Sequence, residues 1–145
     1  MNIRMKIVRE VALAADRMYD QAQHFGNLAA RALGTDRRSQ ITGLESIANS
    51  SQKVSDVLDY VKLRTARDHQ TRREKGWHKD ELGKTLLAFF ETDLRKERDT
   101  LCTSKDLLSL DDFQRQEVYI LLIRAFVARL AAQYEYAVSI SETLS

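Results

Sequence analysis

The chain has 145 residues, of which 43% are apolar and 30% are charged, and its formal net charge is +2. These values are typical of one globular domain, residues 1–145, and exclude a disordered chain. The one cysteine excludes a disulfide framework and suits a reducing compartment. No apolar run approaches the roughly 20 residues that cross a membrane, so we expect a cytoplasmic protein. Proline is absent and there are five glycines, which favours long helices over strands and turns.

The first predicted helix covers residues 2–33. Its apolar side chains recur at alternating steps of three and four, a spacing that keeps them on one face, as in bundles and coiled coils. The residues of this stripe are Val8, Val11, Ala15, Met18, Ala22, Phe25 and Ala29. Gly34 follows the last of them and suits a left-handed helix terminus.

A second helical region follows a short polar connection and ends near Arg67. Its apolar stripe consists of Leu44, Ile47, Val54, Leu58 and Val61. The polar run Asn49–Ser51 interrupts the stripe, and Ser51 is a candidate N-cap for a new helix. The region is therefore one helix or two nearly collinear helices. Residues 68–78 have no apolar period and are predicted to form a loop.

The third predicted helix starts near Lys79, and residues 103–110 connect it to the last helix. Its apolar face is expected to consist of Leu82, Leu86, Phe90 and Leu94. The last helix runs from about Asp111 to about Ser141, with Ser109 as its candidate N-cap. It is apolar around most of its circumference, which is usual for a helix at the centre of a bundle or in an interface with a partner. We therefore predict an all-α, largely antiparallel bundle of about four long helices.

Positive charge is concentrated between Lys62 and Lys79. This segment carries seven basic and two acidic residues, so its net charge is +5 and the rest of the chain carries −3. Cations at a helix end and loop can neutralise phosphates, and Trp77 and His69 could stack on a base. The predicted nucleic-acid-binding residues are Lys62, Arg64, Arg67, Arg72, Arg73, Lys75, Trp77 and Lys79. The alternative is a solvated helix end whose cations interact with the helix dipole.

One histidine pattern bears on catalysis. Arg64-x4-His69 fits the Arg-x4–6-His pattern of the all-helical HEPN ribonucleases. In that family the arginine stabilises phosphate charge and the histidine assists attack by a 2′-hydroxyl. His24 and His78 also follow an arginine at such a spacing, so all three histidines fit the pattern. The pattern therefore does not distinguish a catalytic pair in this chain.

Other catalytic and metal-binding motifs are missing from the sequence. A helical di-iron site uses two Glu-x-x-His motifs, and the chain has none. One cysteine and three scattered histidines do not make a zinc site. Cys102 has no histidine near it in the sequence, and the glycines are isolated, as a phosphate-binding loop would not be. We therefore expect no enzymatic activity, no metal and no cofactor.

Two functional hypotheses remain. The first is a non-catalytic assembly subunit that docks on itself or on a larger complex, because the first helix has a long apolar stripe and the last a wide apolar face. The second is an RNA-binding or RNA-processing domain that uses the basic segment, with a HEPN-like ribonuclease as its catalytic form. Small helical subunits of RNA-guided complexes are similar to this chain in size and helical content. The similarity is one of fold class, and no residue motif supports it. The expected partners are a protein or further copies of the chain, with nucleic acid as a candidate and no membrane.

Overall fold

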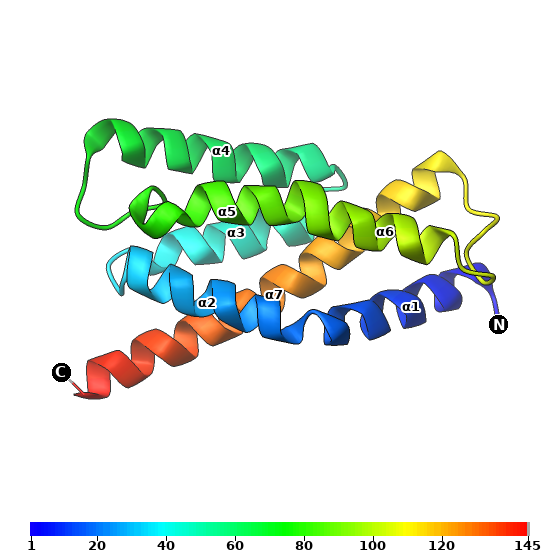
Figure 1. Ribbon diagram of the computed structural model, residues 1–145, viewed down its shortest axis with the longest axis horizontal. Helices are drawn as coiled ribbons and strands as arrows, with labels where there is room; N and C mark the ends of the chain where they lie inside the picture. Colours follow the sequence, from blue (N-terminus) through cyan, green and yellow to red (C-terminus); the bar gives the residue numbers. More distant parts are fainter. Residues whose placement is uncertain (145) are drawn as a thin grey trace.

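The computed structural model, in which residues 1–144 are described and side chains as far as residue 141, is built of helices (Figure 1). The elements are α1 (Ile3–Arg17), α2 (Tyr19–Leu33), α3 (Arg38–Ser50), α4 (Val54–Thr71), the 3-10 turn η1 (Lys79–Glu81), α5 (Leu82–Ala88), the π-helical segment η2 (Phe89–Leu94), α6 (Arg95–Cys102) and α7 (Asp112–Leu144). Because α5, η2 and α6 form one continuous rod, the described chain has six helices. The all-α prediction is confirmed, and the expected number of four is wrong. Successive rods alternate in direction in Figure 1, with α1 and α2 together as the first.

The predicted first helix is divided into α1 and α2 at Met18, whose φ of −102° and ψ of 15° depart from the helical values. The Asn2 side chain caps α1 by accepting a hydrogen bond from the backbone N–H of Met5. Every residue of the predicted stripe is buried except Val8, which is 53% exposed. Gly34 ends α2 with a positive φ of 63°, as expected for a residue without a Cβ. The stripe is therefore mostly part of the chain's own core.

The break near Ser51 is confirmed, but α3 and α4 form a hairpin and are not collinear. The Tyr60 hydroxyl on α4 donates a 2.7 Å hydrogen bond to the Gln40 carbonyl on α3, so the two helices lie side by side (Figure 1). Ser51 is not the N-cap of α4, a position that Lys53 occupies. The Ser51 hydroxyl instead accepts the Lys53 N–H at 3.0 Å and donates to the Asp56 carboxylate at 2.6 Å. Helix α4 also continues beyond the predicted end, to Thr71.

The π-helical segment η2 contains two consecutive aromatic residues that are both buried. Phe89 is 8% exposed and Phe90 is 0% exposed. The Phe89 ring stacks on the Phe126 ring of α7 with the centroids 4.7 Å apart. The Tyr119 hydroxyl donates a 2.6 Å hydrogen bond to the Phe90 carbonyl, which ties η2 to α7.

The long helix α7 lies at the centre of the bundle. It contacts α1, α2, α3, α4, α6 and η2. Asp111 is its N-cap: the Asp111 carboxylate accepts the Gln114 N–H at 2.8 Å, and the Gln114 side chain accepts the Asp111 N–H at 3.0 Å. The prediction of Ser109 as the cap is therefore wrong. Because the wide apolar face of α7 packs within the same chain, it no longer favours assembly. No helix in the described part of the chain has the length and apolarity needed to cross a membrane.

Candidate nucleic-acid interface

Residues 72–78 form a loop between α4 and η1 at one end of the bundle. This loop packs against the end of α2, because the Gly76 N–H donates a 2.9 Å hydrogen bond to the Ala32 carbonyl. The Lys75 ammonium donates to the Arg31 carbonyl at 3.0 Å. In Figure 1 the loop and the connection between α2 and α3 lie at the same end of the molecule. The loop part of the basic segment thus packs against the end of the bundle.

The buried carboxylate of Asp68 holds this loop in place. Asp68 is 3% exposed, and its Oδ2 accepts a 2.8 Å hydrogen bond from the Trp77 backbone N–H. The Arg37 guanidinium lies 3.5 Å from Oδ1 of the same carboxylate. A Cβ atom added to Gly76 would lie 2.7 Å from Oδ2 of Asp68, so the close approach requires glycine. Asp68, which counted only as a negative charge in the sequence, therefore positions the loop.

Trp77 is part of the core and not of the surface. Its side chain is 0% exposed, and its Nε1 donates a 2.5 Å hydrogen bond to the Gln40 side-chain oxygen. The Tyr60 ring packs edge-on against the indole, with the centroids 6.3 Å apart. A buried indole cannot present a face on which a base stacks, so we correct the prediction and remove Trp77 from the binding residues.

The seven predicted cations have no carboxylate partner among the described residues. Lys62, Arg67, Arg72, Arg73, Lys75 and Lys79 are exposed, and Arg64 is half-buried. Elsewhere, arginines on α1, α3, α6, α7 and the α2–α3 connection do form ion pairs with carboxylates, namely Arg4, Arg9, Arg17, Arg37, Arg38, Arg98 and Arg129. The segment thus carries seven cations and two acidic residues, and it keeps a net charge of +5.

The cations are distributed over two sides of α4 and the loop. Arg64 lies over the Tyr60 ring, 5.3 Å from its centroid, on the side of α4 that faces α3. Lys62 lies on the other side, toward α5. Arg73 and Lys75 line a hollow of about 500 Å³ together with Glu74 and with Asp36 and Arg37, which are far away in the sequence. Arg37 is paired with Asp68, so folding brings both signs of charge to this part of the surface.

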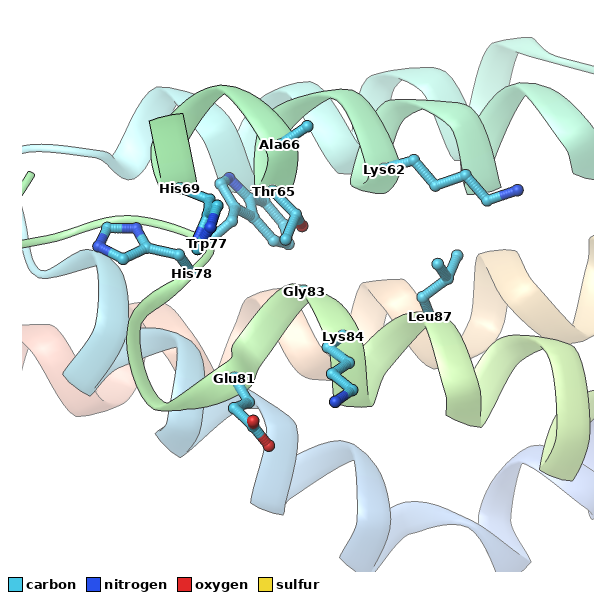
Figure 2. A pocket seen from close by; sticks show the side chains of 10 residues that line it. All are labelled: Lys62, Thr65, Ala66, His69, Trp77, His78, Glu81, Gly83, Lys84 and Leu87. Atoms are coloured by element: carbon cyan, nitrogen blue, oxygen red, sulfur yellow. The ribbon is translucent and has the colours of Figure 1, made fainter. Parts of the chain in front are cut away.

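A second hollow, of about 510 Å³, lies between α4 and α5 (Figure 2). Its lining residues are Lys62, Thr65, Ala66, His69, Trp77, His78, Glu81, Gly83, Lys84 and Leu87. In Figure 2, His69, Trp77 and His78 gather at one end, and Lys62 and Leu87 lie at the other. At Gly83 the two helices approach so closely that an added Cβ would lie 1.7 Å from the Thr65 hydroxyl. Sequence reasoning missed this hollow, because its walls come from helices that a loop separates.

The two residues of the HEPN-like pattern do not meet within one chain. Arg64 lies against Tyr60 on the α3 side of α4, whereas His69 lines the hollow on the α5 side. Five residues along an α-helix correspond to roughly 140° around its axis, which explains the separation. The pattern in the sequence therefore does not correspond to one joint site in the fold.

Burial shifts the pKa values of two groups that lie near arginines. Burial raises the pKa of the Cys102 thiol above its usual range, and the opposing effects of Arg115 and Arg98 are smaller. Burial likewise raises the pKa of Tyr60 in spite of the neighbouring Arg64. Within the described residues, no three His, Cys, Asp or Glu side chains gather as a metal site would need. Comparisons of the chain with family models, curated proteins and solved structures returned no match.

Proposed function

We propose that the protein is a non-catalytic binding subunit that contacts single-stranded nucleic acid through the cationic end of its bundle. The cationic end consists of Lys62, Arg67, Arg72, Arg73, Lys75 and Lys79. The observation that carries the proposal is that these exposed cations are concentrated in one segment of net charge +5 and have no carboxylate partner in the described chain. Unpaired cations release phosphate counterions on binding, which is the main source of affinity for a nucleic-acid backbone.

The backbone of the loop gives Arg72 a left-handed conformation, with φ 52° and ψ 39°, in which its N–H bonds to the Asp68 carbonyl at 3.1 Å. An L-residue with a side chain is disfavoured there relative to glycine, by about 1 kcal/mol. Asp80 and Glu81 are left-handed as well, so the exposed charge of Arg72, and not its conformation, supports the proposal.

The test compares two triple variants that change the net charge equally. Arg67→Ala/Arg72→Ala/Arg73→Ala removes cations of the cationic end. Arg4→Ala/Arg17→Ala/Arg129→Ala removes three cations that are paired with Glu117, Glu97 and Asp16. Fluorescence anisotropy with a labelled single-stranded RNA should show roughly a tenfold or larger loss for the first variant and little for the second. Equal losses would contradict a localised interface.

A second function, self-association, is favoured by an outward apolar stripe on α1. Met1, Met5 and Val8 are 66%, 55% and 53% exposed, and with the exposed Ala12 they are spaced by four, three and four residues. This spacing matches a coiled-coil seam. The ion pairs Arg4–Glu117 and Asp16–Arg129 place α1 beside the first half of α7, where Phe113 is 77% exposed.

The charges beside the stripe are already engaged within the chain, because Arg9 pairs with Asp106 and Asp16 with Arg129. The exposed apolar side chains of the stripe therefore carry the proposed association with a second copy. Sedimentation of the wild-type protein should then show a dimer at micromolar concentration, and Met5→Glu/Val8→Glu should sediment as a monomer. A monomeric wild type would exclude this association.

A further inference from the structure

We infer that the hollow between α4 and α5 is a subsite for one nucleotide, with the base inside the hollow and the phosphate at its rim. The choice of a nucleotide as ligand rests on the proposed binding of single-stranded nucleic acid. The volume of about 510 Å³ lies within the range of roughly 300–1,000 Å³ found for small-ligand pockets.

The interior of the hollow suits a planar, largely apolar group with polar edges. Ala66 and Leu87 provide apolar walls from the two facing helices, and the covered Trp77 borders the same space. The Thr65 hydroxyl donates a 2.7 Å hydrogen bond to the Val61 carbonyl and packs against Gly83, so it closes the hollow where the two helices meet. The exposed His69 imidazole can stack on the base or bond to its edge.

The rim carries charge suited to a single phosphodiester. Lys62 on α4 and Lys84 on α5 are exposed, and neither is paired with a carboxylate among the described residues. Glu81 adds one negative charge at the α5 side, so the lining has a net charge of +1 when its histidines are neutral. One phosphodiester carries one negative charge, which matches the net charge of the lining. The several negative charges of a nucleoside triphosphate would exceed the positive charge of the rim. The chemistry therefore fits a nucleotide within a strand better than a free triphosphate.

The hollow borders the cationic end at His69, which lies at the end of the hollow nearest the loop that carries Arg72 and Arg73 (Figure 2). Lys62 is the residue of the cationic end that lines the hollow, and it lies at the opposite end (Figure 2). A strand whose phosphates lie on the loop can therefore turn one base into the hollow. Unstacked bases held beside a basic groove are a common way in which proteins bind single strands.

The test uses a variant that fills the hollow and a matched surface variant. Ala66→Phe adds a ring at an exposed helical position that lines the hollow, and Ala132→Phe makes the same change at an exposed position of α7. Trp77 is the one tryptophan in the sequence and borders the hollow, so its fluorescence reports occupancy. The probes are uridine monophosphate, uridine, inorganic phosphate and a labelled single-stranded RNA, with circular dichroism to confirm folding.

The inference predicts a saturable fluorescence change with uridine monophosphate, a weaker one with uridine and none with inorganic phosphate. Ala66→Phe should abolish that change and weaken RNA binding by roughly tenfold, about the contribution of one stacked base, while Ala132→Phe leaves both unchanged. If RNA binds Ala66→Phe as well as it binds the wild type, the inference is overturned and the proposed function stands. If the nucleotide binds but the RNA does not, the subsite is supported and the strand-binding proposal fails. If neither binds, both are wrong.

Discussion

Oδ2 of Asp68 accepts the backbone N–H of Trp77 at 2.8 Å, a contact between the last turn of α4 and the far end of the loop that carries the cations. The same carboxylate lies 3.5 Å from the Arg37 guanidinium, so it also joins the loop to the connection between α2 and α3. The position of the loop that carries Arg72, Arg73 and Lys75 therefore depends on one buried acidic residue.

Replacing Asp68 should destabilise the protein strongly. Asp68→Ala leaves a buried N–H and a largely buried guanidinium without their acceptor, at a cost of roughly 2–4 kcal/mol in the free energy of unfolding. Asp68→Asn keeps an acceptor oxygen and should cost less. Asp59→Ala, at an exposed position of the same helix, should stay within about 0.5 kcal/mol of the wild type. Urea unfolding measures the free energy of unfolding of all three variants. Equal stabilities for the two alanine variants would contradict the role given to Asp68.

Trp77 should matter for folding rather than for contact with a base. Trp77→Ala removes a fully buried ring and its hydrogen bond to Gln40, and should cost roughly 3–5 kcal/mol of stability. Trp77→Phe keeps part of the packing and should cost less. A Trp77→Ala protein with wild-type stability and weaker RNA binding would instead restore the stacking role expected from the sequence.

Arg72 allows stability and binding to be separated. Arg72→Gly relieves a left-handed backbone conformation and should raise stability by about 1 kcal/mol. It also removes one cation, so the affinity for RNA should fall. Arg73→Gly is the control, because Arg73 is not among the non-glycine residues with positive φ and gains nothing from glycine. An Arg72→Gly protein that is more stable and binds RNA as well as the wild type would show that Arg72 does not contact phosphate.

The reactivity of Cys102 should follow its burial. The thiol is 3% exposed, and burial raises its pKa, so less thiolate forms near pH 8 than in a free cysteine. Alkylation by iodoacetamide should be slow in the native protein and fast in urea. Because the folded-state pKa is the higher one, stability should fall as the pH rises above the ordinary pKa of a thiol toward that of the folded protein. Fast alkylation of the native protein at pH 8 would contradict this burial.

Periodicity predicted which residues of each helix face the core, and for most of them it was correct. Leu82, Leu86, Phe90 and Leu94 are all 0% exposed. It could not predict the hairpin at Ser51, because a stripe stays in phase whether the next helix continues or reverses. The break at Met18 was missed for a related reason, since the stripe passes through it without interruption.

The site was harder to predict than the fold, because burial is decided by residues far away in the sequence. Trp77 stands among cations in the chain, yet Gln40 and Tyr60 enclose it after folding. In the sequence, Asp68 is one acidic residue within a basic segment. Its role in holding the loop depends on the close approach of Gly76 and Arg37 in the fold. Composition located the cationic segment, whereas the hollow beside it required the packing of α4 on α5.

The dependence of RNA affinity on salt tests the central claim most directly. If four cations of the cationic end contact phosphates, a plot of log K against log salt should have a slope of about −3 for single-stranded RNA. Arg72→Ala/Arg73→Ala should reduce the magnitude of that slope by about one unit or more. Arg17→Ala/Arg129→Ala changes the net charge equally but removes paired arginines of α1 and α7, and should leave the slope unchanged. The absence of saturable binding at ~0.1 M salt, or equal flattening by both variants, would contradict the account.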